Sequence, residues 1–426
     1  MRIGFISTRL AGTDGVSLET AKWATVLNRM GHEIFYCAGE LDKDSPHGSL
    51  IPEMHFHDVK NKQISNHAFG YDIKLKSEED KSREISELKR KIERYSNKLK
   101  KEIKKFIIRY NINLLICENI LEIPMHIPLG IAVTELIKET NVPTIAHHHD
   151  FYWERNRFLK NYVQDILDNY FPPDLPSIQH VVINSLAKND LLNRRKIEST
   201  VIPNVFNFST NPPKIDDYNR DFRKTIGLKS EDILILQPTR IVRRKGIELA
   251  IELIKKLNDE RFKLVVTHHP GDEGMGYFNW LKTVAKESKV KVHWVFNQID
   301  THRKQKDKRK IYSLWDAYLN TDFVTYPSSY EGFGNALLET IYFKLPVLVN
   351  RYPVYKEDIR PKGFDFVEID GEITDDTVRR VSNILKNPEL KKKIVNKNYK
   401  IATKYFSYEL LEKKLTTLIN KVNWES

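Results

Sequence analysis

The chain has 426 residues, 40% of them hydrophobic and 30% charged, a composition ordinary for a globular protein. At roughly 100–200 residues per domain, this length predicts two or three domains that each bury a core. No apolar run approaches the roughly 20 residues of a membrane-spanning helix, and the first strand is too short and too soon polar for a signal peptide. Two cysteines, Cys37 and Cys117, fit a reducing cytosol and give no disulfide framework. We therefore expect a cytoplasmic protein.

The charge balance is basic, with 69 Lys and Arg against 57 Asp and Glu, or +12. Nucleic acid, an anionic membrane or a small anionic ligand could each account for it. The lysines are spread out among glutamates, which is typical of a solvated surface. The densest basic cluster, residues 302–310, has no aromatic residue for base stacking, and we predict a loop or a helix start there. We expect no nucleic-acid partner, and no sequence feature supports association with a membrane surface.

Short apolar runs alternate with helical patterns along the first half of the chain. An amphipathic helix is expected at residues 17–31, directly after the first run. Unbroken apolar runs of this kind are typical of strands buried on both faces of a parallel sheet. The expected strands are residues 2–8, 32–39, 112–119, 142–149 and 180–185.

Residues 79–109 are almost wholly charged apart from a narrow apolar stripe. This pattern predicts one long amphipathic helix packed on the first domain. Binding to a membrane surface or a partner is an alternative without support. The stripe consists of Ile85, Leu88, Ile92, Tyr95, Leu99 and Ile103.

A stretch rich in Pro, Asn and Asp, residues 203–219, has no period and predicts a linker. After it the alternation starts afresh, so the chain is expected to form two doubly wound α/β domains. The expected strands are residues 232–240, 262–269, 290–296, 322–328 and 345–350, with helices at 245–257 and 335–344. The expected organisation is an N-terminal domain at 1–205, a linker at 206–230, a C-terminal domain at 231–405 and a last helix at 406–426 that packs back toward the N-terminal domain.

Functional residues are expected just after the apolar runs, because ligands of such domains bind beyond the carboxyl ends of the strands. Gly332 and Gly334 allow a tight turn and close approach of a ligand. Asn335 is a good helix cap, and the free amides there would hold phosphate oxygens. Glu331 and Glu339 flank this turn, and carboxylates accept hydrogen bonds from vicinal hydroxyls. A nucleotide sugar offers both groups, whereas the alternative is a plain helix cap beside a surface glutamate.

A diphosphate would also need positive charge from a neighbouring strand end. Arg240 directly follows an expected strand, and Lys245 precedes Gly246 and the next helix. Their charge would matter most as negative charge builds on a leaving diphosphate. Arg243 and Arg244 are expected to be exposed, since four cations cannot all converge on one diphosphate.

These elements, with the "VIPNVF" boundary and the N-terminal "GTDGVSLETAKWATVLNRMGHEI", resemble glycosyltransferase family 4 over nearly the whole chain. The resemblance implies retaining enzymes of the GT-B fold, with two Rossmann-like domains that face each other across a cleft. The N-terminal domain would bind the acceptor, and the C-terminal domain the nucleotide sugar. At the N-terminal loop the family often has two adjacent glycines, whereas this chain has Gly12 and Gly15 around Thr13 and Asp14. Gly15 and Val16 are expected near the acceptor.

The resemblance also implies roles for the residues already singled out. Arg240 and Lys245 would bind the diphosphate, and Glu339 the ribose. The donor sugar would be held by Glu331, Gly332, Phe333, Gly334 and Asn335. The donor would be a UDP- or GDP-hexose carrying glucose or mannose. The acceptor would be a hydroxyl of a small polar molecule or saccharide, and an anionic acceptor is one alternative. No cofactor or metal is expected to be required.

Three consecutive histidines end the strand at 142–149. Only His147 and His149 would share a face of that strand, and no second ligand cluster is evident, so we expect no metal site. A neutral histidine satisfied inside the sheet would account for His147 or His148. The resemblance places His149 close to the donor sugar and acceptor, with Asp150 either positioning it or meeting the acceptor.

Aromatic and charged residues follow the histidines. Tyr152 and Arg155 are expected to meet a polar or anionic acceptor, although Tyr152 and Trp153 equally fit a core.

The expected activity is therefore transfer of a hexose, with retention, to give an α-glycoside. One alternative is a nucleotide-sugar epimerase of similar architecture, which would need no acceptor. The other is a non-catalytic basic binding protein, which would bind in a salt-sensitive way without turnover.

Overall fold

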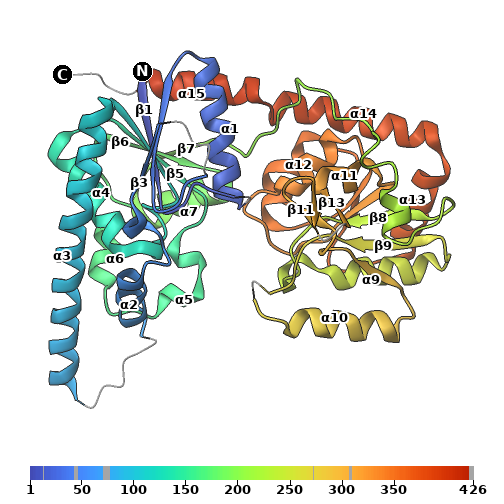
Figure 1. The fold of residues 1–426 in the computed structure, drawn as a ribbon, viewed down its shortest axis with the longest axis horizontal. Coiled ribbons are helices and arrows are strands. Elements are labelled where there is room, and N and C mark those ends of the chain that lie inside the picture. Colours follow the sequence, from blue (N-terminus) through green and yellow to red (C-terminus); the bar gives the residue numbers. More distant parts are fainter. Residues whose placement is uncertain (13, 43–46, 71–76, 272, 307–308, 422–426) are drawn as a thin grey trace. The chain divides into compact units, whose positions relative to one another are not determined.

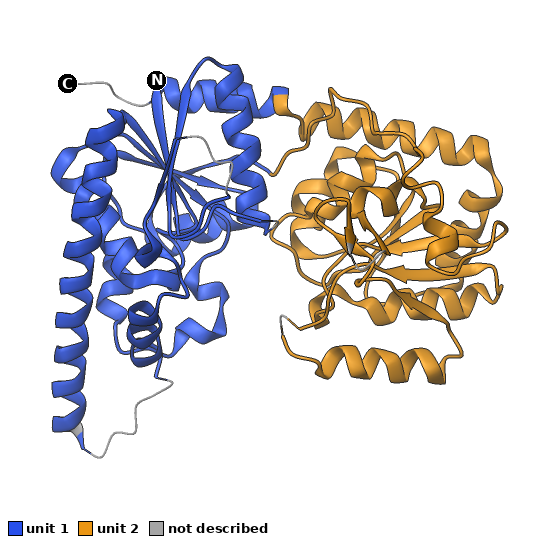
Figure 2. Ribbon diagram, in the orientation of Figure 1, with its two compact units in different colours: residues 1–203, 409–426 blue, residues 204–408 orange. Residues whose placement is uncertain are grey.

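The structure is a computed structural model that describes residues 1–426 except 13, 43–46, 71–76, 272, 307–308 and 422–426. The chain divides into two compact units (Figure 2), with residues 1–203 and 409–426 in unit 1 and residues 204–408 in unit 2. Each unit is a parallel sheet surrounded by helices (Figure 1). The α/β class with two parallel sheets, predicted from the alternation of apolar runs and helical patterns, is confirmed.

Unit 1 is built on a seven-stranded sheet in the order β3-β2-β1-β4-β5-β6-β7, and every neighbouring pair is parallel. Its strands are β1 (Arg2–Ser7), β2 (Glu33–Ala38), β3 (Gly48–Leu50), β4 (Leu114–Glu118), β5 (Thr144–His148), β6 (Ile178–Val182) and β7 (Ser199–Val201). Its helices are α1 (Gly15–Arg29), α2 (Val59–Ala68), α3 (Glu78–Tyr110), α4 (Ile127–Thr140), α5 (Asn156–Leu159), α6 (Gln164–Tyr170), α7 (Ser185–Arg195) and α15 (Tyr408–Asn420). Short 3-10 turns occupy Pro52–Met54, Pro124–His126 and Tyr152–Glu154.

The long charged segment forms the single helix α3, as its apolar spacing predicts. Its start is capped by Ser77, whose hydroxyl accepts a hydrogen bond from the backbone N–H of Asp80 at 3.1 Å. The apolar stripe from Leu88 to Phe106 is buried, and the helix packs against α2 and α4. Packing on unit 1 therefore accounts for the stripe. None of the helices in the described ranges combines the length and apolar character needed to cross a bilayer.

Unit 2 holds a six-stranded parallel sheet in the order β10-β9-β8-β14-β15-β16 and a small sheet in the order β11-β13-β12. The strands are β8 (Ile233–Gln237), β9 (Phe262–Val266), β10 (Val292–Trp294), β11 (Ile299–Asp300), β12 (Lys304–Lys306), β13 (Arg309–Ser313), β14 (Phe323–Tyr326), β15 (Val347–Asn350) and β16 (Val367–Ile369). The helices are α8 (Phe222–Thr225), α9 (Ile247–Leu257), α10 (Gly276–Glu287), α11 (Leu314–Leu319), α12 (Asn335–Tyr342), α13 (Asp375–Lys386) and α14 (Pro388–Tyr405). Single helical turns occupy Arg243–Lys245, Tyr355–Ile359 and Arg360–Lys362.

Residues 206–230 differ from the expected linker, because they belong to unit 2. Phe222 is fully buried, and so is Asn219, whose side-chain amide donates to Asp316 at 2.8 Å. A segment that contributes to the core has a fixed place in it. The stretch rich in Pro, Asn and Asp that suggested a linker is therefore part of this unit from residue 204 on.

The basic cluster at 302–310 also differs from its prediction, since its described residues form strands β12 and β13 rather than a loop or a helix start. The hydroxyl of Tyr218 lies 2.9 Å from the carbonyl oxygens of both Lys304 and Ile311, one on each strand. Tyr218 is more than eighty residues away in the chain, so no local pattern could show that these strands form.

The last helix, α15, belongs largely to unit 1, which regains the chain at Glu409. Leu411 and Leu415 are fully buried. The ammonium group of Lys414 donates to the carbonyl oxygen of Val201 at 2.9 Å, at the end of β7. The chain thus returns to its first sheet after completing the second.

Gly39, directly after β2, lies tightly against the backbone of His55. A Cβ atom at this position would lie 2.1 Å from the backbone nitrogen of His55. Because backbone cannot rotate away as a side chain would, we expect Gly39→Ala to lower the free energy of unfolding by about 1–3 kcal/mol. Chemical denaturation of the variant measures this change.

The matched control is Gly276→Ala, at the first residue of α10, where no atom lies within 4 Å of an added Cβ. This control should be neutral or slightly stabilising. Equal denaturation midpoints for the two variants would contradict the close approach at Gly39.

Candidate active site

Two loops of unit 2 meet because their strands are parallel neighbours. β8 pairs with β14, so the segments that follow them leave the same edge of the sheet. Gly246 has φ +60°, and a Cβ there would lie 2.5 Å from the carbonyl oxygen of Pro327. The backbone N–H of Ser329 donates to the carbonyl oxygen of Arg244 at 2.8 Å. The predicted diphosphate-binding segment and the predicted glycine turn are therefore in direct contact.

Glu331 is the centre of this contact and is only 7% exposed. One carboxylate oxygen forms an ion pair with the ammonium group of Lys245, which is 8% exposed, and the other accepts from Arg244 at 3.2 Å. Burial opposes ionisation of Glu331, but Lys245 and Arg244 outweigh it and lower its pKa. The pKa of Lys245 is lowered too, in this case by burial, although Glu331 acts against the shift. An anion that binds here would compete with Glu331 for Lys245.

The arginines around Lys245 differ in their surroundings. Arg243 is exposed, as predicted, and lies over the rings of Tyr277 and Trp280 at 5.6 and 5.7 Å. Arg240 is exposed on the segment that follows β8. Arg244 was predicted to be exposed, but its side chain is partly buried and contacts Glu331 and the carbonyl oxygen of Tyr330. This correction adds Arg244 to the candidate site.

The glycine turn is shaped by two buried tyrosines. Gly334 has φ +129°, and a Cβ there would lie 2.7 Å from the hydroxyl of Tyr352 and 3.4 Å from that of Tyr326. The Tyr352 hydroxyl donates to the carbonyl oxygen of Phe333 at 2.7 Å, which holds the turn in place. Asn335 was predicted to cap the following helix, but it is the first helical residue and Gly334 occupies the cap. Since glycine has no side chain to cap the helix, the first amides of α12 suit an anionic ligand.

Glu339 lies one turn into α12 and is partly buried. Its carboxylate accepts a hydrogen bond from the hydroxyl of Tyr318 at 3.0 Å. Tyr318 is 1% exposed and stacks on Phe343 with ring centroids 4.9 Å apart. Tyr318, which orients the carboxylate predicted to bind ribose, was not predicted from the sequence.

In unit 1, His149 follows β5, and the neighbouring strand β4 ends at Glu118. The Glu118 carboxylate is fully buried, and one of its oxygens lies 2.9 Å from Nδ1 of His147 and 3.2 Å from Nε2 of His149. Glu122, also fully buried, accepts from the backbone N–H of His149 at 3.2 Å. The indole of Trp23 stacks on His147 at 4.2 Å. Neither glutamate was predicted, although Glu118 ends an apolar run, where functional residues are expected.

These buried groups ionise differently. Burial opposes ionisation of Glu118, but His147 and His149 outweigh it and lower its pKa to about 2. Burial raises the pKa of Glu122 to about 8 and lowers that of His148 to about 3. Burial also acts to lower the pKa of His149, yet the hydrogen bond and charge of Glu118 raise it overall. Glu118, whose pKa is lowered, therefore faces His149, whose pKa is raised.

The same three side chains, Glu118, His147 and His149, could hold a metal ion, because their ligand atoms all lie within 4.8 Å of one another. Two histidines with a glutamate form a ligand set that suits zinc. The structure thus adds Glu118 as a third possible ligand, which was not predicted from the sequence. The two short His–Glu contacts are equally those of hydrogen bonds, so the geometry alone requires no ion.

Two further predicted residues lie beside His149. Asp150 is paired with Arg155 at 2.5 Å rather than with His149, so Glu118 takes the positioning place expected for Asp150. Tyr152 is 8% exposed and belongs to the core of unit 1, with a ring contact to Trp153 at 5.0 Å. The prediction that Tyr152 meets an acceptor is therefore corrected in favour of the core alternative. The side chain of Arg155 is 41% exposed and is paired with Asp150.

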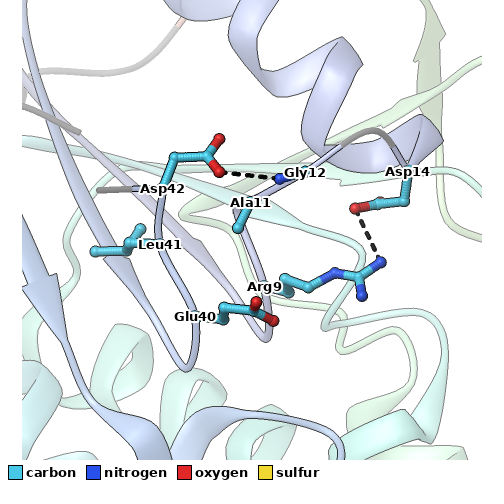
Figure 3. Close-up of a pocket in the computed structure, with 7 residues that line it drawn as sticks. All are labelled: Arg9, Ala11, Gly12, Asp14, Glu40, Leu41 and Asp42. Atoms are coloured by element: carbon cyan, nitrogen blue, oxygen red, sulfur yellow. Dashed lines mark hydrogen bonds and ion pairs between the residues drawn. The ribbon is translucent and has the colours of Figure 1, made fainter. Parts of the chain in front are cut away.

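Gly15 and Val16 begin α1 beside a pocket of about 520 Å³ at the ends of β1 and β2 (Figure 3). Asp14 caps this helix and accepts from the amides of Val16 and Ser17 at 3.1 and 3.2 Å. It also pairs with Arg9 at 3.0 Å (Figure 3). A carboxylate already occupies this helix start, so it suits hydroxyl groups better than a phosphate. The pocket is lined by Arg9, Ala11, Gly12, Asp14, Glu40, Leu41 and Asp42.

Comparison with known proteins identifies the class to which these features belong. Residues 219–401 match the family described as "Glycosyl transferases group 1". The chain belongs to this family of glycosyltransferases, since it also matches two relatives along most of its length.

Both relatives are mannosylglucosylglycerate synthases. The protein from Petrotoga mobilis is 37% identical over 390 residues, which cover 87% of this chain and 86% of that protein. The protein from Thermotoga maritima is 33% identical over 443 residues, covering 97% and 98%. Among solved structures, sucrose-phosphate synthase from Thermosynechococcus elongatus has a TM-score of 0.67 at 16% identity and covers 100% of both chains. The fold is the GT-B fold that the resemblance implied.

The contact between Tyr318 and Glu339 gives a test of the predicted ribose-binding carboxylate. Tyr318→Phe removes one hydrogen bond to a charged group and should weaken binding of a nucleoside diphosphate by about tenfold. Isothermal calorimetry measures the affinity. The matched control is Tyr312→Phe, a buried tyrosine of the same unit whose hydroxyl donates to Asp221 at 2.9 Å. If both variants bind nucleotide as the wild type does, Glu339 has no part in nucleotide binding.

Proposed function

We propose that this glycosyltransferase moves a mannosyl group from a nucleotide diphosphate mannose to a hydroxyl of glucosylglycerate, with retention, to form an α-mannoside. The observation that carries the proposal is the name shared by the two relatives, which match 87% and 97% of the chain. That product joins mannosyl, glucosyl and glycerate groups, and mannosyl transfer is a reaction that would complete it. GDP-mannose is the first donor to test, and UDP-glucose is the other donor expected from the sequence. We propose no requirement for a metal ion.

The pairing around Glu331 supports a donor with both a diphosphate and a sugar. A diphosphate that recruits Lys245 would leave Glu331 buried without its main partner. Leaving one member of a buried ion pair uncompensated typically costs about 3–5 kcal/mol. Sugar hydroxyls can donate to Glu331 in place of Lys245, so a nucleotide sugar supplies a new partner to both members at once.

The chain's own groups account for the main steps of the proposed transfer. The bond between C1 of the sugar and the diphosphate oxygen breaks, and Lys245, with Arg240, stabilises the negative charge that develops on the leaving group. The acceptor oxygen bonds to C1 on the same face, and its proton passes to the leaving diphosphate. His149 would orient the reacting hydroxyls. Retention rests on the family resemblance.

The acceptor carries several hydroxyls and one carboxylate, and unit 1 offers partners for both. Asp14, Glu40 and Asp42 line the pocket at the ends of β1 and β2 and can accept from hydroxyls. Arg9 lines the same pocket, Arg155 follows the histidines of β5, and either could bind a glycerate carboxylate. Both arginines are already paired, with Asp150 and Asp14 respectively, so they would bind the carboxylate within a charge network.

The proposal is tested by supplying the purified protein with GDP-mannose or UDP-glucose, each with glucosylglycerate, glycerate or no acceptor. We expect a mannosylated product only from GDP-mannose with glucosylglycerate. Its anomeric signals in NMR should be those of an α-mannoside. Transfer of glucose, or transfer only to another acceptor, would overturn the substrate assignment. Conversion of the donor to its epimer without any acceptor would favour the epimerase.

Lys245→Ala should reduce turnover by roughly 10²–10³-fold, because it removes one contact to the charge that develops on the leaving group. Steady-state assays of sugar transfer measure the effect. Arg243→Ala is the matched control, since Arg243 belongs to the same helical turn but is exposed over Tyr277 and Trp280. Normal turnover of a folded Lys245→Ala variant would show that the diphosphate lies elsewhere.

His149→Ala should abolish transfer while nucleotide binding survives. His149 belongs to unit 1, whereas the residues expected to contact the nucleotide belong to unit 2. Loss of orientation at the reacting atoms can cost about 10²-fold or more in rate without altering nucleotide affinity. Titration with nucleoside diphosphate and a transfer assay on the same preparation test this. Near-normal transfer would mean that the histidine run is structural.

A further inference from the structure

Glu118 is buried, contacts the rings of His147 and His149, and has no role in the transfer as described so far. It ends β4, in register with His147 of the neighbouring strand β5. Its side chain is 0% exposed, and one of its oxygens, Oε2, receives both histidine contacts. A buried charge is retained at a cost unless its partners compensate it. Packing alone therefore does not explain why a glutamate is found at this position.

We propose that Glu118 is a positioning residue for the transfer reaction: it holds Nε2–H of His149 and thereby presents Nδ1 of His149 to the reacting sugar and acceptor. The inference rests on the proposed function, because it assumes that His149 serves the reacting groups. Glu118 itself would touch neither substrate.

The argument follows from what a carboxylate can accept. An ionised carboxylate has no proton to donate, so each nitrogen that faces it at 2.9 and 3.2 Å must carry the hydrogen. His147 therefore has its proton on Nδ1, and His149 has its proton on Nε2. In a neutral imidazole the other nitrogen is then an acceptor, which fixes the tautomer. Nδ1 of His149 is left as the ring nitrogen that can accept from, or when protonated donate to, a substrate hydroxyl.

The surroundings hold this arrangement rigidly. Trp23 stacks on His147 from α1, and the hydroxyl of Ser7 donates to the backbone carbonyl of Glu118 at 3.0 Å. Glu122 accepts a hydrogen bond from the backbone N–H of His149 and so fixes its backbone, while Glu118 fixes its ring.

Few charged groups bear on His149. Glu118 comes from β4, Glu122 from the segment after β4, Glu19 from α1, and His147 from its own strand. Glu118 contacts the ring directly, through Nε2 at 3.2 Å. The raised pKa of His149 is consistent with this contact, because burial acts in the opposite direction.

The first measurement is made on the wild-type protein labelled with ¹⁵N-histidine. The signals of His149 are assigned by their loss in His149→Gln. At a pH above its pKa, the ¹⁵N shifts should show the Nε2–H tautomer. Observation of the Nδ1–H tautomer would overturn the proposal. This measurement needs no substrate, so it stands or falls independently of the proposed donor and acceptor.

The second measurement compares Glu118→Gln with Glu122→Gln, two substitutions of equally buried carboxylates. Glu118→Gln should lower the pKa of His149, because burial then acts without the opposing hydrogen bond and charge of Glu118. It should also lower kcat by about 10²-fold while the affinity for nucleoside diphosphate stays unchanged. Glu122→Gln should leave the tautomer of His149 in place and lower its pKa less than Glu118→Gln does, since Glu122 contacts a backbone N–H rather than the ring.

Three outcomes would overturn the proposal. One is an unchanged pKa of His149 in Glu118→Gln. Another is an equal fall of that pKa in both variants, which would indicate a general effect of disturbing the buried pocket. The third is a stoichiometric zinc ion in the purified protein that Glu118→Gln releases, because the three side chains would then be metal ligands. If Glu118→Gln fails to fold, the wild-type tautomer measurement still decides.

Discussion

Parallel pairing of adjacent strands is the constraint on which both candidate sites depend. Parallel strands end at the same edge of a sheet, so residues far apart in the chain meet there. In unit 2 this pairing joins the segment after β8 to the glycine turn after β14. In unit 1 it joins the end of β4 to the histidines of β5. In each unit the result is a buried glutamate, Glu331 or Glu118, with basic partners from another segment.

Burial makes the partners of these two glutamates essential. A carboxylate taken out of water without compensation would give up its charge or destabilise the fold. Glu331 keeps its charge because Lys245 and Arg244 face it, and Glu118 keeps its charge because His147 and His149 do. Glu122 differs: it accepts from two backbone N–H groups, and the histidine nitrogen 3.1 Å from it, Nδ1 of His148, belongs to a ring whose pKa burial lowers to about 3. The pKa of Glu122 accordingly rises to about 8. The choice of partner thus decides which buried carboxylates stay ionised.

The sequence predicted what depends on local pattern. Apolar runs located most strands, the spacing of its stripe located α3, and the glycine turn with Glu331 and Glu339 was evident from residue types alone. Tyr318, Arg244 and Glu118 were missed because their roles come from contacts made through the fold. Strands β12 and β13 of the basic cluster were missed for the same reason, since Tyr218 contacts both of them from a distant segment. The error at Tyr152 is different, because an aromatic residue after a strand fits a core and a binding site equally well.

The pairing of Lys245 with Glu331 has a consequence for selectivity among ligands. The net charge of +12 would attract any anion to the surface, but the cations next to the glycine turn are already matched by a carboxylate. A free phosphate or nucleoside diphosphate gains Lys245 only by taking it from Glu331, a penalty that the remaining contact to Arg244 offsets in part. A ligand that adds hydroxyl donors beside its diphosphate removes that penalty. This penalty comes from one buried charge that has lost its main partner, so the site favours the sugar-bearing nucleotide over the free nucleotide. The carboxylate that looks unfavourable beside a phosphate is thus the group that allows this site to distinguish a donor from its product.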